Sequence, residues 1–182
     1  MARVPYLSPE ELPDEDQDLL ARDIALNRAL VNSRGGARAF WTLGYWIRRD
    51  SVIDPRLREI AILQIGYLTK NAYEFSHHIP IGYESGLTDA DIDDLIRVEA
   101  GEKALVLSKL DLKVLEATKQ VLREGAVAGG TFTELRQELG VEVVVELTLI
   151  ISFYIGVVHL LDTLEIDLED SYLPYLERFS LY

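Results

Sequence analysis

The sequence predicts an all-helical protein. Apolar residues recur at helical spacing along most of the chain, capping residues precede these segments, and no segment gives a confident strand. The 182 residues are 48% hydrophobic, which is enough to bury a core. We therefore expect an all-α fold of about seven to nine helices, in a single domain over residues 1–182.

The N-terminal region contains three expected helical segments. Ser8–Pro9 is typical of a capped first turn, because serine suits the N-cap and proline the first helical position. A longer helix is expected after Pro13 and should end before Gly35–Gly36. Residues 37–48 then form a strongly aromatic helical segment.

The next segments carry the clearest boundary signals. Asp54–Pro55 supplies an N-cap and an N1 proline for a helix that reaches about Thr69 and is apolar on nearly every side. A further helix over 71–85 ends at Gly86, and Thr88–Asp91 opens another in the manner of a capping box. The first of these helices is predicted to be centrally buried.

The second half of the chain predicts helices over 105–123, 133–139 and 141–164, set off by glycines. The last of them contains β-prone runs of valine and isoleucine. Because it has no internal turn signal, its length favours a buried helix over strands. The remaining segment, 165–182, is acidic and aromatic.

Composition excludes several classes of function. A formal net charge of −13 argues against binding to nucleic acid or an anionic membrane surface, since both need clustered Lys and Arg. The N-terminus has no signal-like apolar region and no run reaches about 18–20 consecutive apolar residues, so we expect a cytoplasmic protein. The same charge disfavours anionic substrates, unless local cations such as Arg56 and Arg58 outweigh it.

Candidate chemistry is concentrated in residues 56–78. This segment holds two of the three histidines, and on a helix Glu74 and His78 are i,i+4 neighbours, as are Tyr73 and His77. A carboxylate beside an imidazole can orient it and alter its pKa, which is an acid–base unit. The alternative is a solvent-facing pair that contributes only a few tenths of a kcal/mol.

Glu59 is a lone acid on the apolar helix that precedes this pair. A carboxylate in such surroundings is either paired or placed at an opening. The available neighbours in sequence are Arg56 and Arg58, so a structural ion pair and a functional role both remain open.

Metal binding has limited support from spacing. Glu74 and His77 have the i,i+3 spacing of di-iron bundles, but the only other histidine, His159, has no matching glutamate, so this site lacks ligands. A mononuclear site built from Glu59, His77 and His78 stays an alternative. His159 lies on an apolar helix and is expected to be a hydrogen-bonded core residue.

The order of these motifs resembles the carboxymuconolactone decarboxylase and alkylhydroperoxidase D superfamily. The resemblance is carried by residues 56–63, by Tyr73-Glu74-x-x-x-His78 and by the Gly86-Leu-Thr-Asp stretch, and it continues through 132–154. It spans roughly residues 35–165. By this resemblance 1–34 is an N-terminal helical extension and 166–182 a C-terminal tail.

The resemblance implies an alkylhydroperoxidase D-like helical domain that assembles as a homo-oligomer, a dimer, trimer or hexamer. Peroxidase members of the superfamily carry a Cys-x-x-Cys motif, and its two positions fall on Asn71 and Glu74. The chain has no cysteine, which excludes thiolate and disulfide chemistry. What remains is similar to the decarboxylase-like branch.

By the same resemblance we expect a decarboxylase-like lyase that acts on a small lactone or carbonyl acid. His78 would be the general acid/base, Glu74 would set its tautomer and pKa, and Glu59 would complete the relay. Tyr73 and His77 are second-choice proton donors. Such chemistry requires no cofactor and no metal.

The competing hypothesis is a non-catalytic helical protein that binds a small molecule or serves in assembly. Trp41, Tyr45 and Trp46 could then line a pocket or a subunit interface, although core packing is favoured for them. A concave pocket that contains Glu59 and His78 would support the enzyme. The same side chains facing open solvent would support the alternative.

Overall fold

The computed structural model describes residues 2–181, and all regular structure within them is helical. This confirms the predicted all-α class. Four short 3-10 helices cover Pro9–Glu11, Asp14–Leu20, Val31–Ser33 and Asp170–Tyr172. The eight α-helices of the described residues are α1 (Ala25–Leu30), α2 (Arg34–Arg49), α3 (Pro55–Thr69), α4 (Ala72–Glu84), α5 (Asp89–Glu99), α6 (Lys109–Glu124), α7 (Gly129–Leu164) and α8 (Leu173–Arg178).

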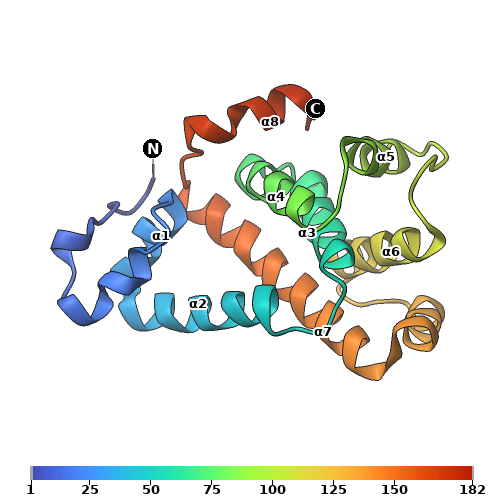
Figure 1. The fold of residues 1–182 in the computed structure, drawn as a ribbon, viewed down its shortest axis with the longest axis horizontal. Coiled ribbons are helices and arrows are strands. Elements are labelled where there is room, and N and C mark those ends of the chain that lie inside the picture. Colours follow the sequence, from blue (N-terminus) through green and yellow to red (C-terminus); the bar gives the residue numbers. More distant parts are fainter. Residues whose placement is uncertain (1, 182) are drawn as a thin grey trace.

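Helix α3 is the buried centre of the fold, as its all-round apolarity predicts. The side chain of Asp54 caps its first turn, and residues 57–66 are buried without interruption. It packs against α4, α6 and α7, and α7 runs diagonally through the middle of the molecule (Figure 1). A Cβ at Gly66 would lie 2.8 Å from the backbone nitrogen of Phe75, so only glycine allows α3 and α4 to approach this closely.

Helix α7 joins two of the predicted helices. Gly140 has a φ of 83°, a non-helical conformation that separates the segments on either side of it. The boundary expected between 133–139 and 141–164 is therefore present, and the segment that was β-prone in isolation is helical. Its buried face contributes to the core beside α3 and α6.

The outer face of α7 is also apolar. Val141, Val145 and Leu149 are four residues apart and are 59%, 58% and 41% exposed, so they form one stripe. By length and composition α7 could cross a membrane, but 44% of its most apolar window is buried inside the protein, and core helices of soluble proteins pass the same test. The expected homo-oligomer, which would cover such a stripe, stays a prediction.

The prediction of one long helix between Pro13 and Gly35–Gly36 is wrong. The chain bends at residues 21–24, where the side-chain amide of Asn27 donates to the carbonyl of Arg22 at 2.6 Å. The two glycines lie inside the first turn of α2, where backbone N–H groups need no helical partner. A Cβ at Gly36 would lie 2.9 Å from Oγ of Ser33, a contact that rotation of the serine side chain can relieve.

The C-terminal segment is part of the packed structure. Helix α8 lies over α4 (Figure 1), and Phe179 and Leu181 are 1% and 6% exposed within the main core. That core also includes Leu26 near the N-terminus. It therefore draws on the predicted extension, the central helices and the tail.

Candidate active site

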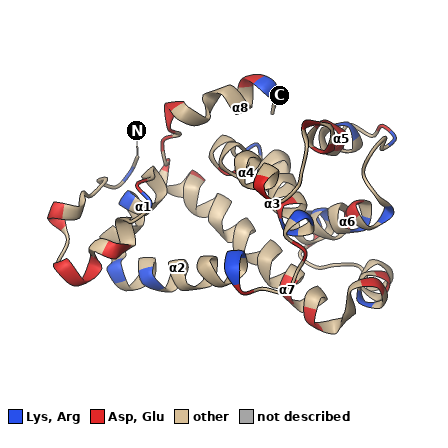
Figure 2. Cartoon of the chain, in the orientation of Figure 1, with Lys and Arg blue, Asp and Glu red and all other residues tan. Residues whose placement is uncertain are grey.

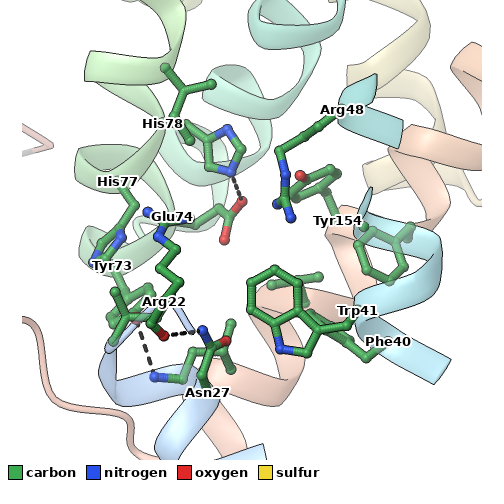
Figure 3. Close-up of a pocket in the computed structure, with 16 residues that line it drawn as sticks. Arg22, Asn27, Phe40, Trp41, Arg48, Tyr73, Glu74, His77, His78 and Tyr154 are labelled. Carbon is green, nitrogen blue, oxygen red and sulfur yellow. Dashed lines mark hydrogen bonds and ion pairs between the residues drawn. The ribbon is translucent and has the colours of Figure 1, made fainter. Parts of the chain in front are cut away.

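His78 lies between two glutamates. Its Nδ1 is 2.7 Å from Oε2 of Glu59, and its Nε2 is 3.1 Å from Oε1 of Glu74, the contact drawn in Figure 3. The three residues are 6%, 0% and 3% exposed, respectively. The alternative of a solvent-facing Glu74–His78 pair is therefore wrong.

Asn71 fixes the start of the helix that carries this pair. Its side-chain oxygen accepts the backbone N–H of Glu74 at 2.8 Å, which caps α4. Its amide nitrogen donates to Oδ1 of Asp162 on α7 at 2.7 Å. The residue at the first cysteine position of the peroxidase motif thus ties α4 to α7, and the helical spacing places Glu74 and His78 on one face.

Glu59 orients His78 from the side of the imidazole that faces away from the pocket. Nε of Arg58 donates to its Oε1 at 2.8 Å, so Arg58 is its partner, whereas Arg56 bonds one aspartate on each of α5 and α6. Burial opposes the ionisation of Glu59, but His78 and Arg58 outweigh it and lower its pKa below the ordinary value. An ionised Glu59 favours the His78 tautomer that carries its proton on Nδ1, which leaves Nε2 to face Glu74.

Glu74 has the opposite tendency. Its complete burial and the nearby charge of Glu59 raise its pKa, against the opposing effects of His78, Arg22 and Arg48. Its Oε1 is close to His78 but off the direction of a hydrogen bond, and it has no other partner among residues 2–181. Glu74 is therefore a buried carboxyl group with a raised pKa, and its Oε1 accepts no hydrogen bond from the described residues.

A small pocket opens beside Glu74 and His78, between the α1 region, α2, α4 and α7 (Figure 3). Its cavity volume is about 50 Å³. Glu59 does not line it, because it lies behind the imidazole. The criterion stated from the sequence, a concave pocket that contains both Glu59 and His78, is therefore met for His78 and not for Glu59.

Arg22, Arg48 and Tyr154 also line the pocket, and none of them is among the candidate site residues found in the sequence. The ring of Tyr154 meets the His78 ring edge-on, with centroids 5.1 Å apart at 85°. Burial raises the pKa of Tyr154, with Glu74 and Glu59 adding to the effect, so it stays a phenol. The only sequence signal for Tyr154 is that the resemblance continues through residues 132–154, and no sequence signal indicates the two arginines.

Tyr73 and His77 are engaged elsewhere, although both line the pocket wall. Nε2 of His77 is 2.7 Å from Oε2 of Glu169, and its ring is stacked between Tyr73 at 4.0 Å and Tyr172 at 3.6 Å. The hydroxyl of Tyr73 accepts the backbone N–H of Leu26 at 3.2 Å. Burial lowers the pKa of His77 despite Glu169, so it is a neutral donor to that carboxylate. Their suggested role as proton donors loses its support.

The mononuclear metal alternative is not supported by the geometry. His77 turns toward Glu169, away from the contact between Glu59 and His78. Within the described part of the chain, no group of three or more His, Asp or Glu side chains is placed to hold a metal ion. His159, expected in the core, is exposed because it lies on the outer side of α7.

Comparison with known proteins agrees with this fold. Residues 36–103 match the carboxymuconolactone decarboxylase family. The structure is similar to a crystal structure from Ralstonia eutropha, described as an alkylhydroperoxidase AhpD core and peroxidase-related protein, with a TM-score of 0.76, 17% identity and 94% coverage of both chains. That identity supports the fold alone. Comparison with curated proteins gives no match.

The family match covers residues 36–103, and together with the similar fold it supports the resemblance read from the sequence. The matched residues include Arg48, Glu59, Glu74 and His78. They exclude Arg22 and the whole of α7.

Proposed function

We propose that this protein is a cofactor-free acid–base enzyme of the decarboxylase-like branch, a lyase or proton-transfer enzyme for a small lactone or carbonyl acid. The observation that carries the proposal is the unpartnered Oε1 of Glu74, a buried carboxyl with a raised pKa that stands between His78 and a pocket. A carboxyl group whose pKa is raised above the ordinary value can act as a general acid or base.

The geometry supports a different division of roles from the one expected. Glu59, and not Glu74, contacts Nδ1 of His78 and sets its tautomer. Glu74 lies at the cavity and contacts Nε2. In the proposal Glu74 exchanges a proton with the substrate and His78 exchanges a proton with Glu74.

For a decarboxylation this proposal balances. The bond between the carboxylate and the adjacent carbon breaks, carbon dioxide leaves, and the electron pair stays on that carbon as an enolate conjugated with the lactone or ketone carbonyl. Glu74 then protonates the carbon, and its proton is restored from water with His78 as the intermediate base. Peroxidase activity through thiols is excluded, since the 182 residues contain no cysteine.

The test compares purified wild-type protein with His78→Asn and Glu74→Gln. Carbon dioxide release and exchange of C–H protons in D2O are measured on a panel of carboxylated lactones and β-keto acids. Each variant should lose about 100-fold or more of the turnover, because each removes a proton-transfer group. His159→Asn is the matched control, since this exposed histidine lies outside the pocket and should leave turnover unchanged.

Equal turnover in all four proteins would refute the acid–base proposal. A folded wild-type protein that binds members of the panel but turns over none of them would favour the alternative of a non-catalytic binding protein. Circular dichroism of all four proteins shows whether each of them is folded.

A further inference from the structure

Two arginines in the pocket lack an acidic partner. Arg22, before α1, and Arg48, on α2, both line it, and neither forms an ion pair with any residue in 2–181. In a chain of net charge −13, acids are abundant and spread over the surface, whereas the C-terminal end of α2 is basic (Figure 2). Figure 3 shows the two arginine side chains on either side of Glu74. Partly buried guanidinium groups without counterions indicate a missing anion.

Two further polar groups of the pocket, on Trp41 and Tyr154, are hydrogen-bond donors. Nε1 of Trp41 is buried and has no partner among the described residues, and the guanidinium of Arg48 lies over the Trp41 ring at 5.4 Å from its centroid. Tyr154 is a phenol at the same cavity. The two guanidinium groups, the Trp41 indole and the Tyr154 hydroxyl together give this lining several hydrogen-bond donors and two positive charges, which suits an anionic oxygen ligand.

A wider cleft continues outward from this pocket. Its cavity volume is about 640 Å³, against about 50 Å³ inside, and Arg22, Arg48 and His77 line both spaces. Arg49 and Arg58 line the outer cleft as well. A ligand can thus place a small reacting group beside Glu74 while its anionic end lies between arginines at the junction.

We propose that Arg22 and Arg48 together bind a substrate carboxylate that is retained through the reaction, so that the substrate class is a small acid with an anionic group in addition to its reacting centre. This inference rests on the proposed function, because it treats the bound anion as the substrate of that reaction. The bound carboxylate must be one that the reaction retains. The carboxylate that leaves as carbon dioxide loses its negative charge, and arginines paired with it would stabilise the charged ground state and slow the reaction. The pair of arginines also explains how a strongly acidic protein accepts an anion.

Arg22 makes this specificity depend on the N-terminal segment. Its carbonyl accepts from Asn27 at 2.6 Å and from the backbone N–H of Ile24 at 3.0 Å, which fixes the bend where its side chain turns inward. The segment lies outside the residues 36–103 that match the family. Because both bonds use the backbone carbonyl, a side-chain substitution at Arg22 leaves the bend intact.

The experiment uses the two tryptophans as reporters in the full-length protein. In a ¹⁵N-labelled sample Trp41 and Trp46 each give one indole N–H signal, assigned with Trp46→Phe, and only Trp41 lines the pocket. Malonate, succinate, glutarate and phthalate are titrated at constant ionic strength, with their neutral diamides as matched ligands. At least one dicarboxylate should shift the Trp41 signal saturably, and its diamide should not.

The variants then separate the arginines from general charge. Arg22→Gln and Arg48→Gln should each raise the dissociation constant of the dicarboxylate about tenfold or more, as expected for the loss of a charged hydrogen bond. Arg136→Gln, an exposed arginine on α7 outside the pocket, should leave it within about twofold and controls for net charge. Backbone amide spectra confirm that each variant is folded.

Two results would overturn the inference: no dicarboxylate produces a saturable Trp41 shift, or Arg22→Gln and Arg48→Gln bind as tightly as Arg136→Gln. Failure of the proposed function is distinguishable from this failure. His78→Asn and Glu74→Gln should retain carboxylate binding, so an anion site that depends on the arginines stands even if those variants prove the acid–base assignment wrong.

Discussion

Two adjacent histidines on α4 have different surroundings despite nearly equal burial and equal distances to a carboxylate. His77 and His78 are 4% and 6% exposed, and each has a ring nitrogen 2.7 Å from a glutamate oxygen. The ring of His77 is enclosed by Tyr73 and Tyr172. The second nitrogen of His78 faces an acid and a cavity. A carboxylate–imidazole pair is therefore a candidate for catalysis only when the other nitrogen stays available.

Helix geometry and the C-terminal segment produce this difference. Successive residues on an α-helix point in different directions, so His78 is directed toward Glu59 on α3 and His77 toward Glu169 beyond α7. Glu169 also accepts the backbone N–H of Ala25 at 2.7 Å, at the start of α1. The His77 pair thus connects α4, the N-terminal region and the tail, which is a structural task.

The largest expected difference between the two pairs is in stability. Glu59→Ala leaves Arg58, which is 6% exposed, as a buried charge without its partner, and should lower the free energy of unfolding by about 3–5 kcal/mol. Glu169→Ala removes a carboxylate with a more exposed side chain and should cost about 1–2 kcal/mol through its lost hydrogen bonds. Urea unfolding followed by circular dichroism measures both values.

Glu59→Gln keeps the comparison usable if Glu59→Ala does not fold. The amide preserves the shape and one hydrogen bond to His78 but removes the charge that holds the proton on Nδ1. This variant should be folded with sharply reduced turnover. If Glu59→Ala were no less stable than Glu169→Ala, the two imidazole pairs would be energetically equivalent and the distinction between them would fail.

The pH dependence of stability should have opposite signs in the two regions. The pKa of Glu74 is raised by burial, so the native state binds its proton more tightly, and the free energy of unfolding falls as pH rises above the ordinary value of 4.5. For Glu169 burial acts upward, but the His77 and Ala25 hydrogen bonds outweigh it and lower its pKa to about 2. Its stabilisation is present above pH 4.5 and is lost as pH falls toward about 2.

Matched amide variants isolate these contributions. Glu74→Gln should flatten the decline in stability on the alkaline side of pH 4.5, and Glu169→Gln should flatten the decline on the acid side. Chemical unfolding at half-unit pH steps from 3 to 8, or about that range, measures both curves. An alkaline decline in Glu74→Gln as steep as in wild type would show that the pKa of Glu74 is not raised in the native protein.

The sequence predicts the contacts of this site between residues that are close in the chain, but not the contacts between distant residues. Asp54–Pro55 predicts the start of α3, and the spacing of Glu74 and His78 predicts their shared face, because both are governed by neighbours within one or two helical turns. Arg22 is more than 50 residues from His78 in the sequence and reaches the site through a bend in the chain. Glu169 is about 90 residues from His78 and reaches the same region through the C-terminal tail. Neither segment has a periodic pattern that would predict this. Tertiary contacts of this kind have no local pattern.

The smallest expected effects come from deleting one hydroxyl in each region. Tyr73→Phe removes the acceptor for the buried backbone N–H of Leu26 and a 3.4 Å contact to Glu169, so it should cost about 1–2 kcal/mol of stability. Tyr154→Phe keeps the ring packed edge-on against His78 and should change stability by less than about 0.5 kcal/mol. In turnover the order should reverse, because only the Tyr154 hydroxyl is free to donate into the cavity. Thermal unfolding and steady-state kinetics on the same two variants test this reversal, and a Tyr73→Phe variant that lost more turnover than Tyr154→Phe would move the reacting group from His78 toward His77.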